Sequence, residues 1–267
     1  MIAFMCLIVF ALEPDPRYRL VLTANRDEFH ERPAQPMHWW SRSGPLAGRD
    51  AKSGGTWLGI APDGRLGAVT NLRSGLPDTG TRSRGELPLS LLAGPSMEAN
   101  LTSIESLRGN YGPFSVLGFD GQRMHFTSNE AASRRQLDDG LHGLSNHLLD
   151  TPWPKLNRGC QSLAAILQAG ATGEALHDAL IREFTDSTPA PDATLPDTGV
   201  GLELERALSS VFIRGRVYGT RATTVVSLTH DGIAEVSEQC YGPDGVEGVK
   251  QRFRFDTLTA ASRSTIQ

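Results

Sequence analysis

The feature that most constrains the fold is a series of short apolar runs joined in pairs by turn residues. An Asp-Gly turn joins residues 114–119 to residues 123–127, and a second Asp-Gly turn joins residues 217–228 to residues 233–239. Asp-Gly between two such runs is a strong local signal for a β-hairpin. Because a hairpin pairs its strands in antiparallel fashion, the chain is not expected to form a doubly wound parallel sheet.

Two further pairs of runs extend this pattern toward the N-terminus. Residues 6–10 and 18–24 are rich in branched and aromatic side chains and are separated by a turn at residues 13–17. Residues 56–61 and 66–70 flank a Pro-Asp-Gly turn. All four runs are therefore predicted to be strands that are joined as hairpins.

The first twelve residues are apolar throughout, as the core of a secretion signal is. No Lys or Arg precedes them, no pair of small residues follows them, and Glu13-Pro14-Asp15 ends the run. A secretion signal requires such flanking features. A buried strand is therefore the better interpretation of residues 6–10.

Between the strands, apolar residues recur at helical spacing. The spacing predicts helices over residues 86–93, 96–108 and 174–184. The strongest signal lies between Pro154 and Gly170, where one helical face carries the following residues: Leu156, Cys160, Leu163, Ala164 and Leu167. Proline at the start and glycine just past the end are typical of helix termini.

The order of elements is strands, helices, strands, helices and strands, with residues 185–199 as a surface excursion and residues 211–213 as a further strand. This order predicts an α+β fold in which two mostly antiparallel sheets pack face to face, with helices outside. No polar linker is long enough to divide the chain, so residues 1–267 are predicted to form one domain.

Composition excludes several classes of protein. The basic residues are scattered and the formal net charge is −4, which argues against a nucleic-acid partner. No run of 18 apolar residues is present, so no membrane span is expected. The three cysteines are far apart and no histidine lies at metal-ligand spacing, so the sequence predicts no disulfide scaffold, no metal and no cofactor. This cysteine usage fits a reducing compartment, and the cytoplasm is expected.

Three groups of residues are candidates for chemistry. Cys6 opens the first strand, and Asn25-Arg26-Asp27-Glu28 closes the second. Asn71 and Asn146 follow later strands, of which the second covers residues 141–144. Charged side chains at a strand end either solvate a turn or line a site, and an asparagine there is often only a turn residue. A cysteine inside an apolar strand is usually just a small buried hydrophobe.

Six segments of the chain match one family. They are MCLIVF (5–10), TANRDEF (23–29), GGTWLGI (54–60), the Gly-x-x-Gly-Ala-Val-Thr-Asn stretch ending at Asn71, GLSNHLLDTPWPKL (143–156) and YGTRATTVV (218–226). On these segments the chain resembles the NRDE family, also called the transport and Golgi organisation protein 2 family. The NRDE tetrapeptide followed about 25 residues later by GGTWLG is a specific combination.

That family in turn resembles the N-terminal-nucleophile hydrolases that cleave bile-salt amides and penicillin V, which implies a four-layered αββα sandwich. In such enzymes a cysteine becomes the first residue of the mature chain. Met5-Cys6 is the pair that matches. The resemblance therefore implies either that Met5 is the true start or that residues 1–5 are a leader that is removed.

The residue types suit this chemistry. A thiol titrates near 8.5 and an α-amino group near 8, so an N-terminal cysteine carries its own base. Arg26 is expected to lower the pKa of the Cys6 thiol, and Asp27 is expected to hold the ammonium by accepting its hydrogen bonds. Because Arg26 and Asp27 are adjacent, they would point to opposite faces of a regular strand.

The two asparagines complete this hypothesis. Asn71 and Asn146 offer neutral N–H donors, which is what stabilising the oxyanion of a tetrahedral intermediate requires. By resemblance to the bile-salt amidases, Asn71 takes the oxyanion role and Asn146 contacts the nucleophile region. The same resemblance adds Arg221, in Tyr-Gly-Thr-Arg, to the polar set.

Candidates for substrate binding lie near the predicted strand ends. Trp39, Trp40 and Trp57 are placed to wall an apolar pocket, although core packing explains Trp57 equally well. Asn25, at the head of the polar cluster, joins this set. His147 is expected to make only local hydrogen bonds, because a self-activated N-terminal thiol needs no imidazole.

Two functions follow from the sequence. The first is a cysteine amidohydrolase that cleaves a non-peptide C–N amide bond of a small-molecule substrate. The second is a non-catalytic binding or carrier protein on the same fold for a hydrophobic ligand, because relatives in this family have been connected with haem handling and with lipid or acyl-CoA metabolism. The two functions differ in whether Cys6 must be N-terminal and nucleophilic.

Overall fold

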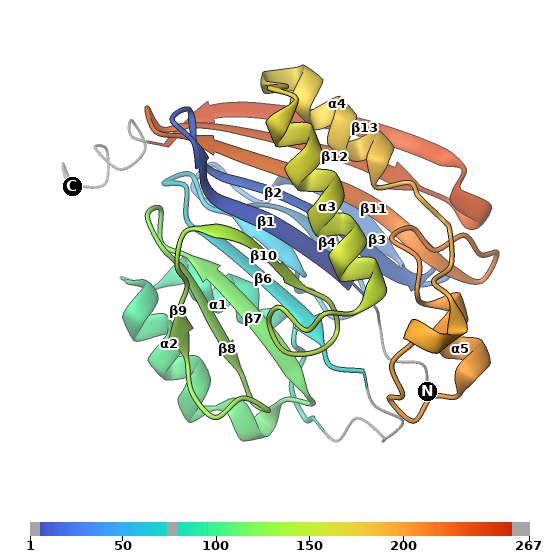
Figure 1. Ribbon diagram of the computed structural model, residues 1–267. Helices are drawn as coiled ribbons and strands as arrows, with labels where there is room; N and C mark the ends of the chain where they lie inside the picture. Colours follow the sequence, from blue (N-terminus) through green and yellow to red (C-terminus); the bar gives the residue numbers. More distant parts are fainter. Residues whose placement is uncertain (1–5, 74–79, 95, 258–267) are drawn as a thin grey trace.

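The computed structural model describes residues 6–73, 80–94 and 96–257, and its strands form two antiparallel sheets that lie face to face (Figure 1). The six-stranded sheet has the order β10-β1-β2-β11-β12-β13. Its strands are β1 (Cys6–Asp15), β2 (Tyr18–Phe29), β10 (Gly140–Leu144), β11 (Tyr218–Thr229), β12 (Ile233–Tyr241) and β13 (Glu247–Asp256). Every neighbouring pair in this sheet is antiparallel.

The seven-stranded sheet follows the chain from one edge to the other, in the order β3 to β9. Its strands are β3 (Ala34–Trp39), β4 (Leu46–Asp50), β5 (Leu58–Ile60), β6 (Leu66–Asn71), β7 (Phe114–Phe119), β8 (Met124–Ser128) and β9 (Arg135–Gln136). Apolar side chains from both sheets meet in one central core, which includes Ile8 and Leu22 of one sheet and Leu58 and Leu117 of the other.

Helices cover the outer face of each sheet (Figure 1). The helices are α1 (Glu86–Ala93), α2 (Met97–Ser106), α3 (Pro154–Gln168), α4 (Gly173–Glu183) and α5 (Leu202–Ala207). The first two pack on the seven-stranded sheet through an apolar cluster, and α3 and α4 pack on the six-stranded sheet through another. The predicted αββα arrangement is confirmed.

The continuous apolar run at the start of the chain has a structural cause. Ile8 and Phe10 face the central core between the sheets, whereas Leu7 and Val9 face the helices. Both faces of β1 are therefore buried, and a strand buried on both faces shows no alternation of polar and apolar residues.

The predicted hairpins are present, and two other segments differ from the sequence-based expectation. Residues 211–213 are not a strand, although all three are buried. The Phe212 N–H donates to the Asp186 carbonyl, and the Ile213 N–H donates to the Thr220 hydroxyl. The three residues are apolar because their side chains pack against other parts of the fold: Val211 in the cluster under α3 and α4, Phe212 against Tyr241, and Ile213 against Leu208. The second predicted helix begins at Met97, because the Ser96 hydroxyl accepts a hydrogen bond from the Ala99 N–H and caps it.

Five helices and strands have no counterpart among the sequence-based predictions: β3, β4, β9, α5 and β13. The last of these is a strand with a mostly exposed polar sequence at the edge of its sheet. Only its second half alternates: Phe253 and Phe255 pack against the central core, whereas the arginines between and beside them are exposed.

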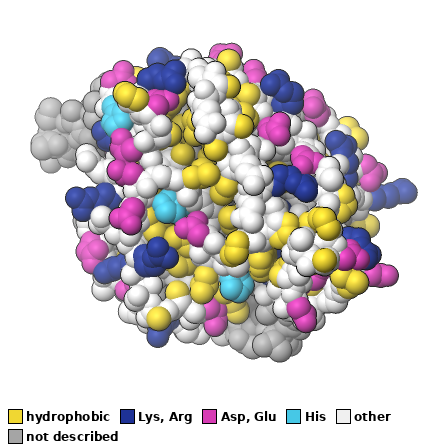
Figure 2. All heavy atoms as spheres, viewed as in Figure 1, with side chains coloured by type: hydrophobic (Ala, Val, Ile, Leu, Met, Phe, Trp, Pro, Cys, Tyr) yellow, Lys and Arg dark blue, Asp and Glu magenta, His cyan; other side chains and the backbone are white. Residues whose placement is uncertain are grey.

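On the face that Figure 2 shows, acidic and basic side chains are interspersed. Among the described residues, no helix combines the length and the apolar character needed to cross a bilayer.

His177, on α4, is a buried histidine held by two serines. Its ring nitrogens lie 2.8 Å from the Ser237 hydroxyl oxygen and 2.9 Å from the Ser227 hydroxyl oxygen. Burial lowers the pKa of His177 to about 4. The unfolded chain therefore takes up a proton between about pH 6.5 and about pH 4 that the folded protein does not, so stability is complete above that range and declines as the pH falls through it.

We expect His177→Gln to remove this acid sensitivity. The free energy of unfolding, measured by urea titration, should fall by about 2 to 3 kcal/mol more in the wild type than in His177→Gln between about pH 7 and about pH 4.5. Equal losses in both proteins would show that His177 is not the responsible group.

Candidate active site

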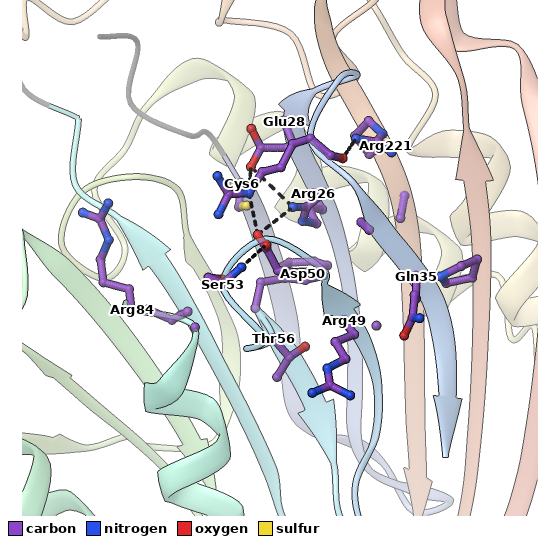
Figure 3. A pocket seen from close by; sticks show the side chains of 18 of the residues that line it. Cys6, Arg26, Glu28, Gln35, Arg49, Asp50, Ser53, Thr56, Arg84 and Arg221 are labelled. Atoms are coloured by element: carbon purple, nitrogen blue, oxygen red, sulfur yellow. Dashed lines mark hydrogen bonds and ion pairs between the residues drawn. The ribbon is translucent and has the colours of Figure 1, made fainter. Parts of the chain in front are cut away.

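The floor of the cavity that contains Cys6 is one row of residues across the six-stranded sheet. Cys6 pairs with Arg26, Arg26 with Ala222, and Ala222 with Cys240. Residues directly opposite each other in neighbouring strands point to the same face. All four line a cavity of about 310 Å³ between the ends of the two sheets (Figure 3).

A tight loop after β4 forms the opposite wall. The Asp50 carboxylate accepts hydrogen bonds from the N–H groups of Lys52 and Ser53. Gly55, in the GGTWLG segment, lies so close to Gly85 that a Cβ on it would approach the Gly85 backbone to 2.5 Å. Only glycine therefore allows this loop to meet the segment that leads into α1.

Cys6 lies at the first residue of β1 and is 7% exposed. Its backbone N–H donates to the Asn146 side-chain oxygen at 3.1 Å. Burial, together with the negative charge of Asp27, raises the pKa of the Cys6 thiol to about 12, and the positive charge of Arg26 opposes this change. The thiol is therefore protonated at neutral pH, and it needs a base in order to act as a nucleophile.

Asn146 connects the two sheets beside Cys6. It follows β10, which pairs with β1, and it adopts a left-handed backbone with φ of 53°, a conformation that asparagine tolerates better than most residues. Its side-chain nitrogen donates to the Asn71 carbonyl at 3.1 Å, and its own carbonyl accepts from the Arg73 N–H at 2.7 Å. Asn146 therefore ties the end of β6 to the start of β1.

Asn71 is the last residue of β6, and it lines the cavity. No hydrogen bond joins its side-chain amide to any residue that the structure describes. The amide N–H groups of Asn71 are therefore available to a group bound beside Cys6.

The polar cluster at the end of β2 divides between the two faces of the sheet, as the alternation of a strand requires. Arg26 and Glu28 line the cavity, where the Arg26 guanidinium lies 3.4 Å from the Glu28 carboxylate and 3.8 Å from the Asp50 carboxylate (Figure 3). The Arg32 guanidinium bonds the same Asp50 carboxylate at 2.5 Å. The Arg26 charge that faces the thiol is therefore held in place by two carboxylates.

Asn25 does not line the cavity. It is fully buried, and its side-chain nitrogen donates to the carbonyl groups of Phe184 and Val211 at 3.0 and 2.8 Å. Its side-chain oxygen accepts a hydrogen bond from the Thr223 hydroxyl. These contacts hold the segment between α4 and β11 against the six-stranded sheet.

Asp27 faces the same side as Asn25 and is also buried. One carboxylate oxygen accepts a hydrogen bond from the Thr220 hydroxyl at 2.6 Å, whereas the other has no partner among the described residues. Burial raises the pKa of Asp27, and the nearby charge of Lys155 opposes that change. Asp27 therefore has one free oxygen beside the start of β1.

Arg221 reaches the cavity through an irregularity in β11. Thr220 pairs with Asp27 and Ala222 pairs with Arg26, so one extra residue is inserted on β11. Such a bulge re-aims a side chain. The Arg221 guanidinium donates to the carbonyl groups of Phe29 and Arg32 at 2.8 and 2.9 Å, so it holds the end of β2 while lining the cavity.

The three tryptophans lie in different places. Trp57 lines the cavity, whereas Trp39 packs edge-on against Phe255, and the Trp40 indole N–H donates to the Ala47 carbonyl. Neither Trp39 nor Trp40 belongs to the described cavity wall. The His147 ring lies 2.9 Å from the Thr151 hydroxyl, which is a local contact, and it is likewise absent from that wall.

The cavity lining is rich in charge. It contains three carboxylates, of Glu28, Asp50 and Glu238, and six arginines, which are Arg26, Arg32, Arg49, Arg82, Arg84 and Arg221. Among the described residues, no group of three His, Cys, Asp or Glu side chains is arranged to hold a metal ion. The functional groups that line this site are a thiol, amides, carboxylates and guanidinium groups.

Three buried charged residues, Lys155, Arg73 and Glu205, are not among the candidates predicted from the sequence. One signal for Lys155 was present. It lies four residues before Gly159 and eight before Leu163, all of which are on the buried face of α3. A lysine at that helical spacing marks a buried charge.

Comparison with known proteins gives a consistent result over most of the chain. A family model described as Transport and Golgi organisation 2 matches residues 5–243. The Transport and Golgi organization protein 2 homolog of Bos taurus is 35% identical over 257 residues, which cover 88% of this chain and 92% of that protein. The Homo sapiens homolog of the same name is 34% identical over 258 residues, with the same coverage of 88% and 92%.

Among solved structures, a Caenorhabditis elegans N-acylethanolamine-hydrolyzing acid amidase ortholog is similar, with a TM-score of 0.50. The two chains are 12% identical, and the similar region covers 82% of this chain and 91% of that one. At this identity the likeness concerns the fold alone.

Proposed function

The chain belongs to the Transport and Golgi organisation 2 family, and from that premise we propose that it is a cysteine amidohydrolase whose nucleophile is Cys6 at a freed N-terminus. The observation that carries this proposal is the position of Cys6. Its thiol lines the cavity, the Asn146 side chain holds its backbone nitrogen, and the Asn71 amide beside it is free of partners among the described residues.

The residues fit the steps of amide hydrolysis. The α-amino group of Cys6 takes the thiol proton, and the thiolate attacks the carbonyl carbon of the substrate to form a C–S bond. Asn71 donates to the oxyanion, and the C–N bond then breaks as the α-ammonium protonates the leaving amine. Water attacks the resulting thioester, which releases the acid and restores the thiol.

A freed α-amino group supplies what the site otherwise lacks. The Cys6 thiol is protonated at neutral pH, because burial raises its pKa to about 12. None of the residues lining the described cavity is a histidine. Removal of the residues before Cys6 therefore converts an amide nitrogen, which cannot act as a base, into an amine that can.

The lining of the cavity favours a small, polar substrate that carries negative charge. A volume of about 310 Å³ is at the lower end of ligand pockets in general. Arginines outnumber carboxylates on its walls, and Trp57 is its one tryptophan among the described residues. A hydrophobic ligand such as a lipid would remove water from these charged side chains without offering them a polar partner. A carrier function for haem or a lipid is therefore the less favoured alternative.

We place this activity in a reducing compartment such as the cytoplasm. All three cysteines are unpaired. Unpaired cysteines are usual where thiols are kept reduced.

An activity-based label tests the proposal. In a chain that begins at Cys6, a lactam such as penicillin V is expected to acylate Cys6, and peptide mass spectrometry should locate the adduct there. Cys160 and Cys240 are expected to stay unmodified, because burial raises their pKa values to about 11 and about 12 and neither carries an α-amino group that could take the thiol proton. Cys6→Ala is the matched control and should take up no label.

Equal modification of all three cysteines would remove the special status of Cys6. Binding of haemin or an acyl-CoA without any turnover of amides would instead favour the carrier function.

A further inference from the structure

Four charged side chains are buried together on the side of β2 that faces away from the cavity. They are Asp27, Arg73, Lys155 and Glu205, and none is more than 6% exposed. They come from β2, from the segment after β6, from α3 and from α5. Two are positive and two are negative, so the group as a whole is neutral.

Two of the four pair directly with each other. The Arg73 guanidinium and the Glu205 carboxylate form an ion pair. The second Glu205 oxygen accepts hydrogen bonds from the backbone N–H and the hydroxyl of Thr198. This pair therefore holds α5 against the end of β6.

The other two, Asp27 and Lys155, are left without direct partners for their charges. The Lys155 ammonium makes no hydrogen bond and no ion pair with any described residue, and one Asp27 oxygen makes none either. An unpaired buried charge destabilises a fold by several kcal/mol. Lys155 is therefore not explained by its contribution to stability.

Both residues lie next to the start of β1. Asp27 directly follows Arg26, which pairs with Cys6. Lys155 lies about one helical turn before Gly159, on the face of α3 that packs against Leu7 and Val9. The Asp27 charge raises the pKa of the Cys6 thiol, while a hydrogen bond from the Asp27 backbone N–H lowers it. The pKa of Lys155 is lowered by burial and by Arg73, and raised by Asp27, by Cys6 and by Glu205. Lys155 therefore lies within electrostatic reach of the nucleophile from behind the strand.

We propose that Lys155 is a positioning residue which balances the charge of Asp27, so that the freed α-amino group of Cys6 remains neutral and able to accept the thiol proton. This inference rests on the function proposed above. An unbalanced Asp27 carboxylate would stabilise the α-ammonium, and a protonated amine cannot act as a base.

The other charged side chains around Cys6 form ion pairs with one another. Lys155 is therefore the cation that is left to balance the Asp27 carboxylate. On the cavity side, the two arginines Arg26 and Arg32 contact the two carboxylates of Glu28 and Asp50. Behind β2, Arg73 is neutralised by Glu205.

The test is Lys155→Met in a chain that begins at Cys6. The rate of Cys6 acylation by penicillin V is measured from about pH 5 to about pH 10. We expect the acid limb of the profile to move up by about one pH unit, because a cation is removed beside the amine. The rate at about pH 7 should fall roughly tenfold and recover at higher pH. A purely structural role would lower the rate equally at every pH.

Lys250→Met is the matched control. Lys250 lies on β13, and its ammonium pairs at 2.6 Å with Asp178 on the exposed surface, away from the cavity lining. Its removal deletes the same side chain and the same charge, and it is expected to leave the pH profile unchanged.

If Lys155→Met alone fails to fold, the same comparison is made in a protein that also carries Asp27→Asn. Asp27→Asn combined with Lys155→Met removes both charges, so no unpaired charge remains behind β2. The combined variant is compared with Asp27→Asn alone, and its acid limb is again expected about one pH unit higher.

Coincident profiles in either background would overturn the role of Lys155 while leaving Cys6 as the nucleophile. A wild-type chain in which Cys6 does not react at any pH would instead overturn the proposed function.

Discussion

A chain whose first residue is Cys6 is expected to react with a lactam at neutral pH roughly 100-fold faster than the chain of 267 residues. Burial raises the pKa of the Cys6 thiol to about 12 when its nitrogen is part of a peptide bond, so only about one thiol in 100,000 is ionised at neutral pH. In the chain that begins at Cys6, the α-amino group takes the thiol proton, and we expect the thiol to react like an ordinary one with a pKa near 8.5. Such a thiol is ionised in a few per cent of molecules. The lower intrinsic reactivity of the weaker base offsets part of this gain, which leaves a factor of roughly 100.

The measurement is the pseudo-first-order rate of adduct formation, followed by intact mass. A chain expressed from Met5 is expected to begin at Cys6 by the same measurement, since methionine is removed before a small residue. Cys6→Ser in the shortened chain is the control for the thiol. Equal rates for the two wild-type chains, or Met5 retained on a reactive protein, would contradict the role of the α-amino group.

Asn71→Ala is expected to lower turnover by roughly 100-fold to 1000-fold, or about 3 to 4 kcal/mol, with little change in apparent substrate binding. The fold should be kept, because the Asn71 side-chain amide bonds no described residue and its carbonyl still accepts from Asn146. Asn71→Asp should be more damaging, because a carboxylate repels the developing oxyanion. Steady-state kinetics with a turned-over amide and thermal denaturation together check this expectation.

Asn157→Ala is a suitable control for Asn71, because Asn157 is an exposed asparagine on α3 that bonds only a local carbonyl. It should retain full turnover. Full activity in Asn71→Asp would exclude the oxyanion role, since a residue that only shapes a turn tolerates aspartate. A carrier protein would show unchanged ligand affinity in both Asn71 variants.

Local patterns were sufficient to predict the layers of the fold. The Asp-Gly turns and the apolar runs beside them depend on residues that are neighbours in the chain, and those hairpins are present. The helix between Pro154 and Gln168 was predicted for the same reason. Strand β13 was missed because its alternation is confined to Phe253 and Phe255, in an edge strand that is otherwise polar and mostly exposed.

The candidate site could be predicted only in part. The alternation of side chains along a strand was enough to assign Arg26 and Asp27 to opposite faces of β2. Which of the two faces lines a cavity could not be predicted, because it depends on what packs against the strand. Trp39 and Trp40 illustrate the same point, since they are as apolar as Trp57 but lie outside the cavity lining.

The sequence by itself determined the antiparallel sheets and the helices outside them, because turn chemistry and periodicity are local. The resemblance of six segments to the NRDE family, and not the local pattern, made Cys6 the candidate nucleophile. Only the tertiary structure decided what surrounds that thiol. Arg73 meets Glu205 across 132 positions, and the Cys6 nitrogen meets Asn146 across 140. The bulge at Arg221 exists only in the pairing of β11 with β2. These contacts arise from strand register and layer packing, which bring together residues whose local sequences carry no information about one another.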